Sequence, residues 1–256
     1  MIRLFLVLAI ISLHVLAKKA PHIVDLTHDV SEKTIHWPET DPFKITKSSA
    51  EVTPEGFYTA ERYFTMSEHL GTHMDAPNHF AKGHPGVDGV SLSQLIGPAI
   101  KVDVSKIVKN NPDHQIGIKD FEQWEKLHGT IPDDTIVLLS TGYGKYWPNL
   151  EKYSGTKKTG IASIPFMHFP GLDPKAAIWL VEKRKIKAIG IDVFGIDYGQ
   201  TKKFEAHQEL TKRDIPIFEN VASMENIPAK NFIIYALPMK LKDGTAAPIR
   251  IIAQVE

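Results

Sequence analysis

Cysteine is absent from the 256 residues of this chain, and its absence excludes several kinds of chemistry. Without cysteine there is no disulfide, no thiolate nucleophile and no zinc site with sulfur ligands. Acceptor sites of the form Asn-x-Ser/Thr, which would carry N-glycans, are missing as well. Outside the cell, such a chain must be stabilised by its core, by oligomerisation or by bound metal.

The chain also lacks any imbalance of charge. Thirty basic and thirty acidic residues give a formal net charge of +0, without a long run of like charges. Nucleic acid and anionic membrane surfaces are recognised by clustered positive charge, so we expect neither as a partner. No repeat, low-complexity tract or linker divides the sequence, and its 43% hydrophobic composition indicates one globular domain.

The first seventeen residues have the pattern of a secretory signal peptide. Arg3 supplies a positive charge, an apolar stretch follows, and Val15 and Ala17 suit recognition by signal peptidase. The stretch is short for a membrane span, and an uncleaved anchor is the alternative. We expect residues 1–17 to be removed, residues 18–256 to form one catalytic domain, and the mature protein to be secreted without membrane attachment.

Short β-branched runs bounded by turn-forming or charged residues predict buried strands. These runs are residues 23–26, 99–104, 135–139, 188–192 and 232–237. Asp173 and Pro174 are a typical N-cap and first helical residue, and the apolar spacing after them predicts a helix. A second helix is predicted from Asp120 to Leu127, ending at Gly129. Interspersed strands and helices indicate an α/β or α+β fold.

Three histidines and one aspartate form the spacing His-x3-His-x-Asp-x3-His. They are His69, His73, Asp75 and His79. All four side chains can bind a divalent first-row metal, although chance clustering among the twelve histidines is the alternative. A straight strand would hold the Cα atoms of His69 and His73 about 13 Å apart, too far for one ion. We therefore expect an extended or looped segment that bends at Gly71.

The run from His69 to His79 resembles the signature of the cyclase-like amidohydrolases, a metal-dependent family of the kynurenine formamidase and isatin hydrolase type. The matching residues are His69, Gly71, Thr72, His73, Asp75, Pro77 and His79. Supporting similarity lies at residues 24–28, at Trp37-Pro38, and at residues 237–240 and 244–250. The resemblance implies the swivelling β/β/α cyclase-like fold, an α/β fold in a single domain, and a homodimer or higher homo-oligomer.

The resemblance also implies a role for each site residue. The metal ligands that it implies are His69, His73, Asp75, His207 and Glu219, the last two at the family's interval of twelve residues. His79 would be the catalytic acid/base. Trp37 would contact the substrate, although a tryptophan in such a segment can equally be part of the core. The family commonly has Gly after the Trp-Pro pair, whereas this chain has Glu39.

These residues predict a hydrolase that cleaves the C–N bond of a small amide by a metal-activated hydroxide. The substrate would be an aryl formamide such as N-formylkynurenine, or a cyclic amide such as isatin. We expect Zn²⁺ first and Mn²⁺ as the alternative, with one or two ions per subunit. A cyclase or lactone hydrolase with the same site is a second hypothesis, and a secreted metal- or ligand-binding protein without turnover is a third.

Overall fold

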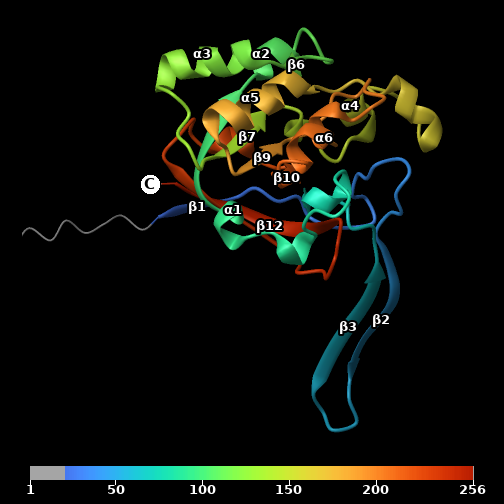
Figure 1. Ribbon diagram of the computed structural model, residues 1–256. Coiled ribbons are helices and arrows are strands. Elements are labelled where there is room, and N and C mark those ends of the chain that lie inside the picture. The colour runs from blue at the N-terminus through green and yellow to red at the C-terminus, as the bar shows by residue number, and fades with distance from the viewer. Residues whose placement is uncertain (1–20, 256) are drawn as a thin grey trace, which may run out of the picture.

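The computed structural model describes residues 21–255 as a mixed α/β domain with one long projecting hairpin (Figure 1). The predicted signal peptide, residues 1–17, lies outside the described residues. Among residues 21–255, none of the helices is both long and apolar enough to span a membrane.

The main sheet is a closed ring of seven strands with an eighth strand at its side. Its order is β1-β12-β11-β5-β7-β9-β10-β4, and β4 pairs back onto β12. Closure is possible because β12 is long: Ala246–Pro248 pairs with β4, and Ile252–Val255 pairs with β1. The bounds are β1 His22–Asp25, β4 His73–Asp75, β5 Ile96–Asp103, β7 Ile136–Ser140, β9 Ala188–Ile191, β10 Ile217–Glu219, β11 Phe232–Pro238 and β12 Ala246–Val255.

Short helices and two small sheets complete the described chain. The α-helices are α1 Leu92–Leu95, α2 Ser105–Val108, α3 Ile118–His128, α4 Leu150–Ser154, α5 Pro174–Arg184 and α6 Glu205–Thr211. The 3₁₀ helices are η1 Pro77–His79, η2 Val87–Gly89, η3 Gly144–Tyr146, η4 Ile161–Phe166 and η5 Met224–Asn226. The small sheets pair β2 Lys44–Val52 with β3 Tyr58–Thr65, and β6 Gln115–Ile116 with β8 Gly171–Leu172.

The two predicted helices are confirmed, and their ends have the predicted causes. In α5, the Asp173 carboxylate accepts hydrogen bonds from the backbone N–H groups of Lys175 and Ala176. Pro174 follows at the first helical position, where its missing N–H costs nothing. Helix α3 ends at Gly129, whose φ of 92° few side chains tolerate. The five predicted strands correspond to β1, β5, β7, β9 and β11.

Strand β7 is buried on both faces, which explains its continuous apolar sequence. Val137 and Leu139 belong to a core cluster that includes Leu180 of helix α5. The alternate residues Ile136 and Leu138 belong to a second cluster, formed largely by strands of the ring. The ring is therefore packed against helices on one side and filled by apolar side chains on the other. Figure 1 shows α3, α5 and α6 on the same side of the sheet.

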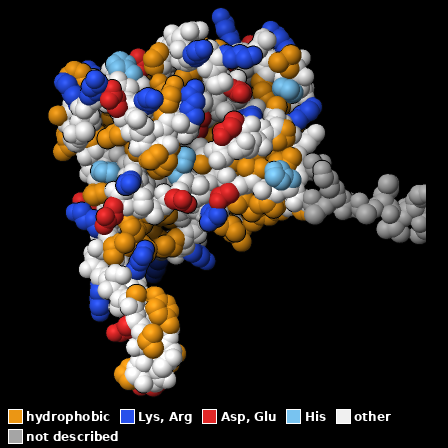
Figure 2. Space-filling model, turned by 180° about the vertical axis from the view of Figure 1, so that it is seen from behind, with side chains coloured by type: hydrophobic (Ala, Val, Ile, Leu, Met, Phe, Trp, Pro, Cys, Tyr) orange, Lys and Arg blue, Asp and Glu red, His pale blue; other side chains and the backbone are white. Residues whose placement is uncertain are grey.

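Strands β2 and β3 form a hairpin that projects away from the ring (Figure 1). Every residue in the two strands is exposed or half-buried. The cross-strand pairs Val52–Tyr58, Ala50–Ala60 and Ile45–Phe64 alternate with charged or polar pairs, so one face of the hairpin is mostly apolar. Figure 2 shows hydrophobic side chains along this projection.

Candidate metal centre

The run from His69 to His79 enters the centre through a bend and leaves it through a short helix. Gly71 has a φ of 66°, in the left-handed region that glycine adopts without strain. Strand β4 begins at His73, and Pro77 starts the 3₁₀ helix η1. The expected bend at Gly71 is confirmed. It brings the ring centroids of His69 and His73 to 5.3 Å from each other.

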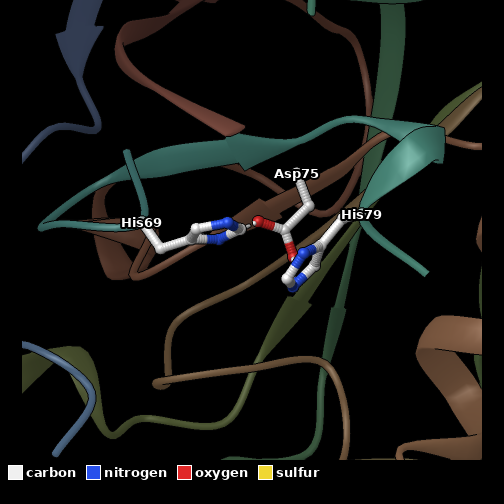
Figure 3. Close-up of side chains that lie close together, drawn as sticks. All are labelled: His69, Asp75 and His79. Carbon is white, nitrogen blue, oxygen red and sulfur yellow. Dashed lines mark ion pairs between the residues drawn. The ribbon is translucent and has the colours of Figure 1, made fainter. Parts of the chain in front are cut away.

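Asp75 lies at the middle of the cluster. Its Oδ1 is 2.8 Å from His69 Nδ1 and 3.2 Å from His73 Nε2. Its Oδ2 is 3.4 Å from His207 Nε2 and 3.9 Å from His79 Nε2. Figure 3 shows the Asp75 carboxylate between the rings of His69 and His79. One carboxylate therefore contacts all four histidines.

Two distant segments close the cluster. Glu219 ends strand β10 and lies directly opposite His73 in the antiparallel pairing with β4. Its Oε2 is 3.4 Å from His73 Nε2, and its Oε1 is 3.0 Å from Nε2 of His207 in helix α6. The structure therefore brings His69, His73, Asp75, His79, His207 and Glu219 together. The separate metal and proton-transfer roles of these six residues stay predictions.

The buried part of this cluster has the chemistry of a metal site. Both carboxylate oxygens of Asp75 and Nε2 of His73 are buried without a hydrogen-bond partner among residues 21–255. Unpaired buried polar atoms are costly, because they lose water without a replacement partner. A divalent ion accepts such converging nitrogen and oxygen lone pairs, so these residues fit one.

Electrostatics favour a cation at the same place. Burial alone would raise the pKa of Asp75, but the three histidines beside it hold that pKa well below its usual range. Burial also lowers the pKa of His73, yet Asp75 and Glu219 outweigh it and raise this pKa to about 10. The ionised carboxylates thus stabilise positive charge, which a proton or a metal ion can supply.

Three of the histidines have their outward-facing ring nitrogen fixed by a hydrogen bond. His73 Nδ1 donates to the Gly71 carbonyl at 3.0 Å, and His207 Nδ1 donates to Asp197 Oδ2 at 2.6 Å. His69 Nε2 lies 3.2 Å from the Thr245 hydroxyl. These bonds assign the ring protons to the outer nitrogens and leave the inner lone pairs facing Asp75.

Sequence reasoning missed the residues that make these outer bonds. Asp197 accepts from His207 Nδ1 and also from the backbone N–H groups of Ala206 and His207. Thr245 donates its hydroxyl to Glu68 Oε2, so its oxygen can accept from His69. Neither partner has a spacing in the chain that would identify it, because the contacts depend on α6 and on the start of β12.

His79 differs from the other three histidines. Its side chain is 29% exposed, and its ring makes no hydrogen bond with the described part of the chain. Burial lowers the pKa of His79 to about 4, against the opposite effect of Asp75. Its position near Asp75 and His69 would also allow it to be a metal ligand. Geometry alone therefore permits both a ligand role and a proton-transfer role.

A cavity of about 310 Å³ opens onto the cluster. Its lining includes Trp37, Phe80, Phe194 and Phe204 beside the histidines and carboxylates. Trp37 meets the rings of Phe194 and Phe204 edge-on, each at a centroid distance of 6.3 Å. It thus packs against the core and also lines the cavity. Its indole N–H donates to Glu39 at 3.1 Å, so the residue that departs from the family pattern also lies here.

Comparison with known proteins agrees with this fold. The family model described as Cyclase matches residues 24–198. The isatin hydrolase of Roseibium aggregatum is 30% identical over 241 residues, which cover 91% of this chain and 86% of that protein. The kynurenine formamidase of Bacillus cytotoxicus is 28% identical, over 91% of this chain and 98% of that protein.

A solved structure gives the same result in three dimensions. Isatin hydrolase A from Labrenzia aggregata, bound to benzyl benzoate, superposes with a TM-score of 0.83. The two chains are 29% identical, and the match covers 92% of this chain and 94% of the other. The chain therefore belongs to the cyclase family, and both the predicted family and the predicted fold class are confirmed.

Proposed function

We propose that this protein is a metal-dependent amidohydrolase that cleaves the C–N bond of a small amide. The observation that carries the proposal is the buried Asp75 carboxylate, whose two oxygens lack hydrogen bonds to residues 21–255 and face histidine nitrogens beside an aromatic cavity. Membership of the cyclase family supports the reaction class, because the similar proteins include an isatin hydrolase and a kynurenine formamidase.

In this proposal, five side chains hold the metal. They are His69, His73, Asp75, His207 and Glu219. Asp75 and Glu219 bring two negative charges, enough for one divalent ion and a partial balance for two. Mixed histidine and carboxylate ligands favour Zn²⁺, with Mn²⁺ as the alternative. When bound, such an ion lowers the pKa of water and polarises a carbonyl oxygen.

His79 carries the proton in the proposed reaction. With a pKa of about 4 its ring is neutral at pH 7, so a ring nitrogen can accept a proton from the attacking water. The resulting imidazolium is a stronger acid than an ordinary one, which suits transfer of that proton to the leaving nitrogen. Its ring is exposed toward the cavity and makes no hydrogen bond with the described part of the chain, which leaves it free to exchange protons with a substrate.

The cavity supports a flat aromatic substrate. Trp37 and Phe204 offer apolar ring surface, and the volume of about 310 Å³ suits a small molecule. An aryl formamide such as N-formylkynurenine and a cyclic aryl amide such as isatin both place a carbonyl next to an aromatic ring. Glu39, held by the Trp37 indole, adds a carboxylate that favours substrates with a donor group on that side.

A substrate panel tests the reaction class. Purified protein is incubated with N-formylkynurenine, isatin and simple lactones, each with and without a chelator, and the products are measured by absorbance. We expect chelator-sensitive hydrolysis of an amide, restored by Zn²⁺ or Mn²⁺. Exclusive cleavage of lactones would favour the lactone hydrolase hypothesis. Metal binding without turnover of any compound would favour the non-catalytic one.

We also propose that the protein forms a homodimer or higher homo-oligomer through the β2–β3 hairpin. An isolated two-stranded hairpin is marginally stable, and this one exposes apolar side chains on one face. Val52 and Tyr58 are each 67% exposed, and Phe64 is 51% exposed. A second copy offers the same apolar face, so two hairpins can cover each other by isologous packing.

Sedimentation velocity tests the assembly with a matched pair of variants. Tyr58→Glu with Phe64→Glu places charge on the apolar face and is expected to give monomers. Thr59→Glu with Thr65→Glu places the same charge on the opposite face and should leave the oligomer intact. A monomeric wild-type protein would contradict the proposal.

Secretion after cleavage near residue 17 remains a proposal as well. It rests on the sequence pattern of residues 1–17. N-terminal sequencing of protein recovered from the medium is expected to begin near Lys18. Recovery of the intact N-terminus in the cell fraction would contradict it.

A further inference from the structure

Asn220 follows the proposed ligand Glu219 and is almost fully buried, with 4% of its surface exposed. Its φ of 53° lies in the left-handed region, which asparagine tolerates better than most residues. Its backbone carbonyl accepts a hydrogen bond from the Thr72 hydroxyl at 2.7 Å. The residue is thus attached directly to the segment between His69 and His73.

The amide side chain of Asn220 reaches the bend itself. Nδ2 donates to the Gly71 carbonyl at 2.9 Å, and the same oxygen accepts from His73 Nδ1 at 3.0 Å. The two donors occupy both lone pairs of this carbonyl. His73 is thereby held with Nε2 toward Asp75 Oδ1 and Glu219 Oε2, at 3.2 and 3.4 Å.

Tyr153 orients the amide. Its hydroxyl donates to Asn220 Oδ1 at 2.8 Å, and the backbone carbonyl of Asp192 is a second acceptor at 3.2 Å. Burial raises the pKa of Tyr153 well above its usual value, so the hydroxyl keeps its proton. A reversed amide would face the Gly71 carbonyl with its own oxygen, which is repulsive. Nδ2 therefore points toward Gly71.

We propose that Asn220 is a positioning residue of the metal centre, which fixes the tautomer and the direction of the His73 ring through the Gly71 carbonyl. His207 receives equivalent support directly from the Asp197 carboxylate. For His73 the support is neutral and acts through the Gly71 carbonyl, which avoids adding another buried negative charge to those of Asp75, Glu219 and Asp197. The inference rests on the proposed metal function.

Asn220→Gly is the test variant, because glycine accepts the backbone conformation while the amide is lost. The affinity of the full mature chain for Zn²⁺ is measured by competition with a chromophoric chelator. We expect it to fall roughly tenfold, the lower end of the effect of losing an outer partner of a metal-bound histidine, because Asn220 acts on His73 through the Gly71 carbonyl. The absorption bands of the Co²⁺-loaded protein and the ¹⁵N shifts of the His73 ring should change as well.

Two control substitutions separate this role from general destabilisation. Asn231→Gly changes an exposed asparagine with a φ of 66° and should leave Zn²⁺ affinity unchanged. Tyr153→Phe keeps Asn220 but frees its amide, and should weaken Zn²⁺ binding in the same direction by a smaller factor. Tyr143→Phe removes another largely buried hydroxyl, whose acceptor is the His168 carbonyl, and should have no such effect.

The outcomes distinguish this inference from the proposed function. If Asn220→Gly and Tyr153→Phe melt earlier but keep wild-type Zn²⁺ affinity and Co²⁺ spectrum, Asn220 is only structural and the inference is wrong. If the wild-type protein binds neither Zn²⁺ nor Co²⁺, the proposed metal function fails and the inference fails with it. If Asn220→Gly does not fold, Tyr153→Phe alone decides between the same results.

Discussion

His73 and His207 are almost fully buried in the metal centre, whereas His79 is more exposed toward the cavity. The two buried side chains are 2% and 6% exposed, and each ring donates its outer N–H to a fixed acceptor. The His79 ring is 29% exposed and has no such acceptor among residues 21–255. Ligands need a constant direction, and a proton carrier needs freedom to exchange. The different surroundings support different roles for chemically identical side chains.

The largest effect is expected from Asp75→Asn, which removes the charge at the middle of the cluster. The variant should retain no stoichiometric metal and lose roughly 10³-fold or more in kcat/KM, about 4 kcal/mol of transition-state stabilisation. Elemental analysis and the substrate panel measure both. Asp113→Asn, which changes a carboxylate paired with His168 away from the centre, is the control. Full metal content in Asp75→Asn would show that Asp75 is not needed to hold the metal, and would contradict its assignment as a ligand.

A smaller effect is expected from Asp197→Asn, which weakens the outer bond of His207. Zn²⁺ affinity should fall 10- to 100-fold, while kcat at saturating Zn²⁺ stays close to that of the wild type. A chelator competition and a Zn²⁺ titration of activity measure the two quantities. Unchanged affinity would mean that this bond does not support a ligand.

Trp37→Leu tests the role of the cavity in substrate binding and leaves the proposed metal ligands unchanged. Loss of aromatic contact is expected to raise KM for an aryl amide up to about tenfold, since aromatic pairs contribute about 0.5–1.5 kcal/mol. Metal content should not change. Trp179→Leu serves as the control, because Trp179 stacks on Phe121 and Arg184 elsewhere in the fold. Equal KM values in the two variants would mean that Trp37 only packs in the core and does not contact the substrate.

A further contrast concerns titration in metal-free protein. The pKa of His79 is lowered to about 4 and that of His73 is raised to about 10, so ¹⁵N NMR should resolve the two rings at opposite ends of the pH range. The folded state binds fewer protons at His79, so stability should fall as pH drops from about 6.5 toward 4. It binds more at His73, so stability should also fall as pH rises from about 6.5 toward 10. Closely similar pKa values for the two rings would contradict the difference between the surroundings of His73 and His79.

Much of this architecture is predictable from the sequence. Five strands, namely β1, β5, β7, β9 and β11, follow from β-branched runs, and the helix Pro174–Arg184 follows from the Asp173 cap and the apolar spacing after it. The bend at Gly71 follows from the spacing of His69 and His73, which a straight strand cannot bring to one ion. The expectation that His207 and Glu219 join these residues in one site depended on the family resemblance, because no local sequence rule relates such distant positions.

Other features could not be predicted because they depend on tertiary contacts. The hairpin strands contain many Lys, Ser and Glu residues, and their apolar positions become one face only when the register is known. Asp197, Thr245 and Asn220 are ordinary polar residues in the sequence. Their importance arises from bonds to His207, His69 and the Gly71 carbonyl, which exist only once the ring of strands has closed.

The most direct test of the division between ligands and proton carrier is His79→Ala, with metal content and turnover measured on the same sample. The account predicts normal metal content and a kcat lower by roughly 10²- to 10⁴-fold, the usual contribution of a general acid/base. Loss of metal together with activity would instead make His79 a ligand, and unchanged turnover would remove it from the mechanism.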